Sequence, residues 1–295
     1  MINPHPALPE FEYFRPSTLR EAVHFLQEHA SDARPFLGGT DCLVALRDKK
    51  IHSAFLVDLK HIEGLNILSF DQQTGLTIGA AVSMNELVAL PEVQQHYPLL
   101  VQAARQVGSY QLRSRATVVG NICNASPCGD TIAPCLVYEG VLHIAGPDGE
   151  RKIPLLEFFT GPGQTVLQTG EIVTSVQLPI PPAGARGVYL PIGRNAVGDL
   201  ALAAVTVLAL PDAQQVSGLR FKIALTAVAP TVIFAEEAQR ILAEGPLDEA
   251  TFAKAAQAAG EACRPIDDIR ASARYRREMI VSLTQTALQE VCAPQ

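Results

Sequence analysis

Two adjacent glycines, Gly38 and Gly39, are the first residues whose type and spacing suggest chemistry. They end a short apolar strand candidate, and Thr40 and Asp41 then open a predicted helix. Glycine accepts positive φ angles and lets another group approach the backbone closely. The first amides of a helix lack partners and carry the positive end of its dipole, so phosphate can bind there. The stretch is therefore either a phosphate-binding turn or a tight turn in which Thr40 or Asp41 caps the helix.

A second stretch, residues 111–134, is dense in donors and acceptors and shows no long helical or strand periodicity. Its glycines and prolines favour turns, so we expect largely irregular backbone along which a polar ligand could lie. A diphosphate needs donors on both sides, and two such turns could provide them if the fold brings them together. The residues concerned are Thr117, Gly120, Asn121, Asn124, Ser126 and Asp130.

Cys123, Cys128 and Cys135 have the spacing Cys-x4-Cys-x6-Cys, which could serve an iron–sulfur cluster because thiolates ligate such clusters. Four ligands are normally needed and only three lie close together, so buried thiols are the favoured interpretation. The histidines are dispersed, and we expect no metal site. Walker, G-x-S-x-G and G-x-G-x-x-G motifs are absent from the sequence, and no side chain is singled out as a catalytic acid, base or nucleophile.

Helices and strands are both predicted among the elements that must position these residues. Thr18 and Glu21 have the spacing of a capping box, as do Ser83 and Glu86. Strands are predicted at 53–59 and 75–82, and a hairpin turn at 147–149. A Pro- and Gly-rich stretch at 178–187 predicts a domain boundary, with domains at 1–180 and 181–295. Beyond it come strands near 201–210 and 219–230, then helices near 233–243, 248–263 and 272–291. Strands followed by helices are typical of an α+β domain.

Composition excludes several classes of protein. The chain has 295 residues, a net charge of −7 and a pI near 5.5. Clustered Lys and Arg, which nucleic acids and anionic membranes require, are missing. The first residues do not resemble a secretory signal, and no apolar run is long enough to span a bilayer. We therefore expect a cytoplasmic protein whose six cysteines stay reduced.

Several ordered stretches resemble the FAD-binding (medium) subunits of the xanthine dehydrogenase and carbon monoxide dehydrogenase family of molybdenum hydroxylases. "LGGTD" and "QLRSRATVVGNICNASPCGD" stand where that family has its two FAD-binding signatures. The resemblance covers essentially the whole chain and includes "RPSTLREAVHFL", "IGAAVSMNEL", "GEIVTSVQLP", "GRNAVGDLALAAV" and "DDIRASARYRREM". It implies an α+β fold: a two-part FAD-binding domain of mixed sheets and helices, followed by a smaller domain with an antiparallel sheet and helices.

The resemblance also implies roles for single residues. Two segments would enclose the FAD diphosphate: Leu37, Gly38, Gly39, Thr40 and Asp41, and then Thr117, Gly120 and Asn121. Asp130 would hold the sugar-alcohol chain or the ring edge. Val107, Val173 and Leu200 would line the isoalloxazine ring, with Leu200 covering one face. A methyl group at Gly39 is expected to lower FAD occupancy and leave the fold largely intact.

Two positions differ from the family pattern. Val119 stands where the second signature usually has its first glycine, so the approach of backbone to the diphosphate would differ there. Pro191 stands where relatives often have a basic residue on the surface near a nicotinamide. This second difference argues against NAD as the electron acceptor.

The resemblance implies an electron-transfer subunit that holds FAD. Electrons would pass between this FAD and two-iron clusters in a small subunit, and a large subunit would hold the molybdenum cofactor and the substrate. The chain lacks the two cysteine quartets that two such clusters need, so these centres belong to partners. The alternatives are a non-redox binding or maturation protein that keeps the fold without FAD, and a free-standing flavin oxidase.

Overall fold

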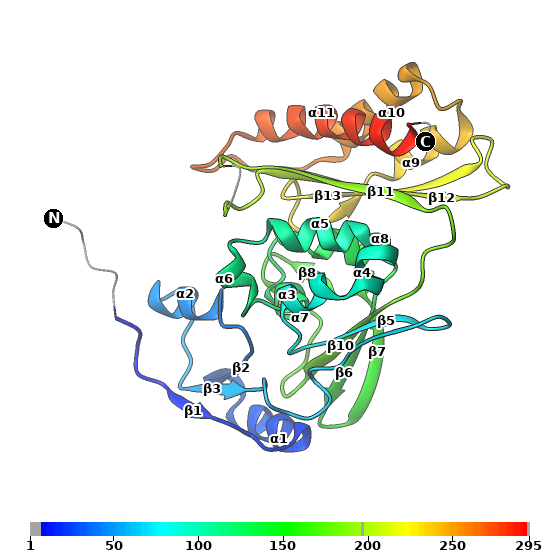
Figure 1. Cartoon of the computed structure of the whole chain (residues 1–295). Coiled ribbons are helices and arrows are strands. Elements are labelled where there is room, and N and C mark those ends of the chain that lie inside the picture. Colours follow the sequence, from blue (N-terminus) through cyan, green and yellow to red (C-terminus); the bar gives the residue numbers. More distant parts are fainter. Residues whose placement is uncertain (1–6, 196–197, 294–295) are drawn as a thin grey trace.

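The N-terminal elements form a parallel three-stranded sheet with the order β1-β3-β2. The computed structural model describes residues 7–195 and 198–293 (Figure 1). The elements of this region are β1 (Glu12–Phe14), α1 (Leu19–His29), the 3-10 turn η1 (Ala30–Asp32), β2 (Ala33–Phe36), α2 (Cys42–Arg47) and β3 (Phe55–Asp58).

Only one of the two hydrogen bonds of the capping box predicted for α1 is formed. The Thr18 hydroxyl accepts a hydrogen bond from the Glu21 N–H at 3.1 Å, as expected for a capping box. The Glu21 carboxylate, however, accepts from the N–H of Ser17 at 2.7 Å, so the reciprocal bond to Thr18 is not made. Ser17 precedes the cap by one residue and presents a backbone donor that this carboxylate can also reach. The capping box of Ser83 and Glu86 is complete.

The second sheet is antiparallel, with the order β4-β5-β10-β6-β7. Its β6–β7 hairpin is the predicted one, and Gly149 has a φ of +117° at the end of the turn. The strands are β4 (Leu68–Asp71), β5 (Gly75–Gly79), β6 (Val141–Gly146), β7 (Gly149–Pro154) and β10 (Ile172–Leu178), and the short pair β8 (Phe159–Gly161) and β9 (Gln164–Thr165) lies between them in sequence after the turn η2 (Leu155–Glu157).

Six helices follow β5 along the chain, and they correct the expectation of irregular backbone at 111–134. Most of that stretch is helical, in pieces of four to seven residues that are too short to show a 3.6-residue period in the sequence. The helices are α3 (Met84–Ala89), α4 (Pro91–His96), α5 (Pro98–Gln106), α6 (Tyr110–Arg113), α7 (Val118–Asn124) and α8 (Ile132–Val137).

The C-terminal part is an antiparallel sheet of order β11-β12-β13-β14 followed by helices, as predicted. Its elements are β11 (Arg186–Ile192), β12 (Ala203–Pro211), β13 (Leu219–Thr226), β14 (Ile233–Phe234), α9 (Glu236–Glu244), α10 (Glu249–Ala262) and α11 (Ala273–Cys292). The predicted start of α9 at Ile233 is wrong, because Ile233 and Phe234 pair with β13 as a short edge strand. The chain as a whole is α+β with several antiparallel sheets, which confirms the predicted class.

Strand β12 is covered on both faces, and this joins the two parts of the chain. The helices α10 and α11 lie above the C-terminal sheet, and α5 and α8 lie below it (Figure 1). Ala203, Val205 and Val207 pack in the upper core, whereas Ala204 and Leu208 belong to the main core with the second sheet. A strand buried on both faces needs a continuous apolar run rather than alternation, and "ALAAVTVLAL" is such a run.

Candidate functional site

A cavity of about 710 Å³ lies among the first turn, α7, β10 and the segment before β12. A cavity of this size is in the range of small-molecule and cofactor sites, roughly 300–1,000 Å³. The structure brings together around it every site residue predicted from the sequence. They are Leu37, Gly38, Gly39, Thr40, Asp41, Val107, Thr117, Gly120, Asn121, Asp130, Val173 and Leu200.

The first turn, residues 37–41, joins β2 to α2 and presents free backbone donors. Within the described part of the chain, no group accepts a hydrogen bond from the backbone N–H of residues 38–41. Asp41 is the N-cap of α2, but its side chain makes no capping hydrogen bond. The cavity wall therefore holds a series of unpaired N–H groups, which is the arrangement that an anion such as a phosphate requires.

Gly38 sets the distance between this turn and the second one. A Cβ at Gly38 would collide with the backbone carbonyl of Arg115, and it would lie 3.1 Å from the N of Ala116. The two turns thus touch through their backbones, two residues before Thr117. Only glycine allows this contact.

Gly39 lines the cavity, but the expectation that a methyl group there would leave the fold largely intact does not fit its surroundings. Its φ is +72°, and a Cβ there would lie 2.5 Å from Cε2 of Phe36. An added methyl group would therefore meet the protein's own aromatic ring and strain the backbone. A Gly39→Ala variant would change the turn itself, so it cannot test ligand contact separately from local structure.

The second turn is the start of α7. The Thr117 hydroxyl accepts from the Gly120 N–H at 2.9 Å, and this capping bond fixes the first turn of the helix. Asn121 is held from the other side, because its Oδ1 accepts from the Thr131 hydroxyl at 2.7 Å. These two hydrogen bonds hold the start of α7 in place. Gly120, which has no side chain, lines the cavity there.

Val119 occupies the position where the family usually has a glycine, and its side chain is buried. It is 1 % exposed and belongs to the main hydrophobic core. The extra side chain therefore packs among apolar neighbours at the cavity wall, and the cap between Thr117 and Gly120 still forms.

The three apolar residues predicted to line a ring differ in their exposure. Val173 is buried in β10, beside a register shift in the pairing with β6. Val107 is the C-cap of α5, and its carbonyl accepts from the Arg113 guanidinium at 2.9 Å. Leu200 is 53 % exposed although it lies in the cavity wall. An apolar side chain of this size left half in solvent beside a cavity is suited to cover a flat ligand.

Asp130 is a buried carboxyl in the cavity wall, 7 % exposed. Its Oδ1 accepts a hydrogen bond of 2.5 Å from the hydroxyl of Tyr189, which comes from β11. Burial raises the pKa of Asp130 to about 6, against the smaller opposing effect of the Tyr189 hydrogen bond. Burial beside this carboxyl also raises the pKa of Tyr189 well above its usual value, so the phenol keeps its proton.

The raised pKa of Asp130 predicts a pH-dependent stability. The folded chain holds a proton between about pH 4 and 6 that the unfolded chain releases, so the Asp130 contribution is present below pH 4 and is lost as pH rises through 6. A shift of this size corresponds to roughly 3 kcal/mol. We expect chemical denaturation of the ligand-free chain at pH 4.5, 6 and 7.5 to show Asp130→Asn becoming progressively more stable relative to wild type. A constant difference across these values would contradict the assignment.

The cysteines of the second stretch are thiols in this structure. Burial raises the pKa of Cys123 and of Cys135 to about 12. Burial also raises the pKa of Cys128, which lies near the guanidinium groups of Arg270 and Arg276. In the ranges that the structure describes, no group of three or more His, Cys, Asp or Glu side chains is arranged to hold a metal ion. All six cysteines are unpaired thiols.

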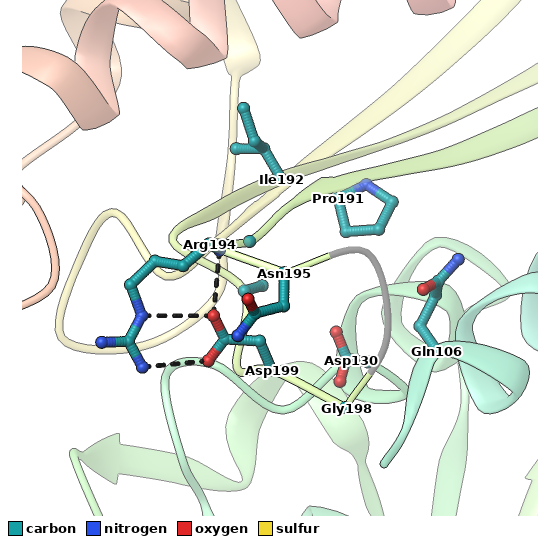
Figure 2. A pocket seen from close by; sticks show the side chains of 10 residues that line it. Gln106, Asp130, Pro191, Ile192, Arg194, Asn195, Gly198 and Asp199 are labelled. Atoms are coloured by element: carbon teal, nitrogen blue, oxygen red, sulfur yellow. Dashed lines mark hydrogen bonds and ion pairs between the residues drawn. The ribbon is translucent and has the colours of Figure 1, made fainter. Parts of the chain in front are cut away.

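A smaller cavity of about 340 Å³ adjoins the larger one and shares Asp130 with it (Figure 2). Its other walls are Gln106 of α5, the end of β11 and residues between β11 and β12. There the Arg194 guanidinium donates to the Asp199 carboxylate, with Nε to Oδ2 at 3.2 Å. Tyr189, Gln106 and this ion pair could not be identified from the sequence. Each polar side chain concerned stands alone in an apolar stretch or in a loop, so no pattern marks it.

The sequence matches two protein families in succession. Residues 9–181 match the FAD-binding domain in molybdopterin dehydrogenase, and residues 189–291 match the carbon monoxide dehydrogenase flavoprotein C-terminal domain. The chain is 33 % identical to the carbon monoxide dehydrogenase medium chain of Hydrogenophaga pseudoflava, over 97 % of this chain and 98 % of the relative. It is 29 % identical to a putative xanthine dehydrogenase FAD-binding subunit of Escherichia coli, over 95 % and 96 % of the two chains.

Solved structures show the same fold. The chain superimposes on a subunit of carbon monoxide dehydrogenase from Hydrogenophaga pseudoflava with a TM-score of 0.91 at 32 % identity, covering 97 % of this chain and 98 % of that one. It superimposes on a chain of quinoline 2-oxidoreductase from Pseudomonas putida 86 with a TM-score of 0.89 at 26 % identity, with the same coverage.

Proposed function

Because the chain belongs to the family of FAD-binding medium subunits of the molybdenum hydroxylases, we propose that its 710 Å³ cavity holds FAD between the two glycine-containing turns. The chain is an oxidoreductase subunit with an electron-transfer role. FAD supplies the redox chemistry, since it can exchange electrons both singly and in pairs. The protein supplies binding, orientation and the exclusion of water.

The observation that supports this site is the set of unpaired N–H groups at residues 38–41, opposite the capped start of α7. Backbone donors without acceptors are costly when they are shielded from water, and a diphosphate would satisfy them. Thr117, Gly120 and Asn121 would face the same group from the other turn. Val107, Val173 and Leu200 would contact the ring system, and Asp130 would face the sugar-alcohol chain or the ring edge.

The proposed partners rest on the family to which the chain belongs. No cluster-forming set of cysteines or metal ligands is present in the described ranges, so iron–sulfur clusters and a molybdenum centre would have to be supplied by other subunits. The relatives are medium chains of multisubunit dehydrogenases. We propose a small iron–sulfur subunit as electron donor or acceptor and a large molybdenum-binding subunit that holds the substrate.

We also propose a cytoplasmic location and a division into domains at 1–180 and 181–295. The unpaired state of all six cysteines supports the first. Helices able to cross a membrane are absent from the portion of the chain that the structure describes. The change of matched family between residues 181 and 189 supports the second.

The first experiment is an absorbance spectrum of the purified chain, followed by acid release of any flavin. We expect the bands of an oxidised flavin and released FAD rather than FMN, because the cavity offers donors on both sides for a diphosphate. If the chain is isolated without flavin, added FAD should raise its melting temperature by mass action. A colourless chain whose melting temperature does not respond to FAD would instead favour a binding or maturation protein that keeps the fold.

A further inference from the structure

A cluster of polar and aromatic side chains lies at the carboxyl ends of the parallel strands, next to the first turn. Phe36 ends β2 and Asp58 ends β3, and these two residues are Cα partners in the sheet. Tyr13 lies on β1, which pairs with the other edge of β3, and Lys60 follows Asp58 by two residues. Ligands of open parallel sheets bind beyond the carboxyl ends of the strands, and Phe36 and Leu59 line the 710 Å³ cavity there.

The Asp58 carboxylate holds this cluster together. It is 2 % exposed, and the Tyr13 hydroxyl donates to its Oδ2 at 2.5 Å. The Lys60 ammonium lies 2.5 Å from Oδ1 and donates to the Tyr13 hydroxyl at 3.2 Å, so the three side chains form a closed set. Burial raises the pKa of Asp58, but the hydrogen bonds from Lys60 and Tyr13 lower it by more, so this carboxylate keeps its charge. The position of the Lys60 ammonium is therefore fixed.

The Lys60 ammonium lies over the ring of Phe36, 4.5 Å from its centroid. This is the geometry of a cation–π contact, which is stronger where the cation is shielded from water, and the Lys60 side chain is 19 % exposed. The Tyr13 ring meets the Phe36 ring edge-on, with the centroids 6.1 Å apart. The Phe36 carbonyl also accepts a hydrogen bond from the Leu59 N–H at 3.0 Å. Both the ring and the backbone of Phe36 are thus held in place.

The ring of Phe36 in turn supports the first turn. Its Cε2 and Cζ atoms lie 2.5 and 2.6 Å from the place that a Cβ of Gly39 would take, so the ring packs directly against the Gly39 backbone. Gly39 has a φ of +72° and belongs to the residues whose N–H groups find no acceptor in the described part of the chain. The direction of these donors depends on the conformation of the turn, and the turn rests on the ring.

A buried ion pair adds little stability by itself, because the loss of hydration of both charges offsets most of their attraction. The pair of Asp58 and Lys60 instead acts on the ring beneath a turn that lines the cavity. We propose that Tyr13, Asp58 and Lys60 are positioning residues for FAD: through Phe36 they hold the first turn in the conformation that binds the diphosphate. This inference rests on the proposed function. A turn that is already ordered loses less conformational entropy when its ligand binds, so the cluster raises the affinity for FAD.

The test is the affinity for FAD, measured by flavin fluorescence, together with thermal melting of the ligand-free chain. Lys60→Met removes the charge and keeps a long side chain, and we expect it to bind FAD about tenfold more weakly. Lys60→Arg, which can still pair with Asp58 and stack on Phe36, should restore most of the affinity. Lys222→Met is the matched control, because Lys222 is 14 % exposed and forms an ion pair with Glu139 outside the cavity wall. It should bind FAD as the wild type does.

Two further variants separate positioning from general stability. Lys60→Met alone leaves the buried Asp58 charge without its cation, which destabilises the fold. The double variant Asp58→Asn, Lys60→Met removes both charges, so it should be more stable than Lys60→Met and still bind FAD about tenfold more weakly than the wild type. A double-mutant cycle with Phe36→Leu shows whether the effect passes through the ring. We expect Lys60→Met to cause little further loss of affinity once Phe36 is replaced.

The outcomes distinguish this proposal from the proposed function. A wild-type chain that takes up no FAD would overturn the binding site itself. If the wild type binds FAD and Lys60→Met binds it equally tightly, only the positioning role is overturned. Wild-type affinity in the double variant would also overturn it, and this variant decides if Lys60→Met does not fold. Additive losses in the cycle would do the same, because Lys60 would then act independently of Phe36.

Discussion

A Gly120→Asp variant should fold normally and lose FAD. Gly120 is the third residue of α7. A Cβ there would crowd one atom, the Thr117 Oγ1 at 2.8 Å, and this side-chain oxygen would have to shift slightly to accept it. An acidic side chain at this position of a helix complements the helix dipole and the capping threonine, so the fold should be retained. The same carboxylate would stand in the cavity wall where the diphosphate is proposed. Repulsion between the like charges should cost about 3 kcal/mol or more, roughly a hundredfold in affinity.

The measurement is FAD binding by flavin fluorescence, together with thermal melting of the ligand-free chain. Gly120→Asn is the matched control, since it has nearly the same shape and no charge. We expect it to weaken FAD binding by less than tenfold. Equal losses in both variants would mean that bulk alone matters at this position, and unchanged binding in both would remove α7 from the site.

A Gly38→Ala variant should separate the two turns. The added Cβ would collide with the backbone carbonyl of Arg115, which cannot rotate away as a side chain could. The first turn must then move away from the start of α7. We expect a loss of about 1–3 kcal/mol in the free energy of unfolding, typical of overpacking, and a loss of FAD binding of at least roughly a hundredfold.

Gly79→Ala is the control for a collision of the same kind elsewhere. A Cβ at Gly79 would collide with the backbone carbonyl of Leu65, but Gly79 lies in β5 and outside the cavity wall. Both variants should be destabilised, and both should be compared well below their melting temperatures. At these temperatures, only the Gly38→Ala variant should lack FAD. Loss of FAD in both would show that general destabilisation, rather than the contact of the two turns, controls binding.

The site residues predicted from the sequence all line one cavity, whereas the backbone that carries them was predicted less well. The glycines and Thr117 could be found because turns and caps require particular residue types. The helices of residues 111–134 could not be predicted, because each is shorter than two full helical turns and shows no 3.6-residue period. Gly39 illustrates a different limit: its residue type indicated a close approach, and the sequence could not show that the ring of Phe36 is one of the groups that approach it.

Contacts between residues far apart in the chain also could not be predicted from the sequence. Tyr189 and Asp130 are 59 residues apart, and the hydrogen bond between them exists only because β11 crosses the end of the loop before α8. The start of α9 was misread for a similar reason, since Ile233 and Phe234 have apolar side chains that suit a helix face and an edge strand equally well. Pairing with β13 decides between these conformations.

The burial of β12 on both faces has a consequence for electron flow. One face of this strand belongs to the same core as the sheet that carries Val173, and Tyr189 on the neighbouring strand belongs to that core as well. The two parts of the chain therefore cannot rotate against each other without exposing a shared apolar layer. Electron tunnelling slows steeply as the gap between donor and acceptor widens. A wall built from both parts of one shared core would hold the flavin at a constant depth below the surface of this chain, so motion between the two parts would not change its distance to a partner docked there.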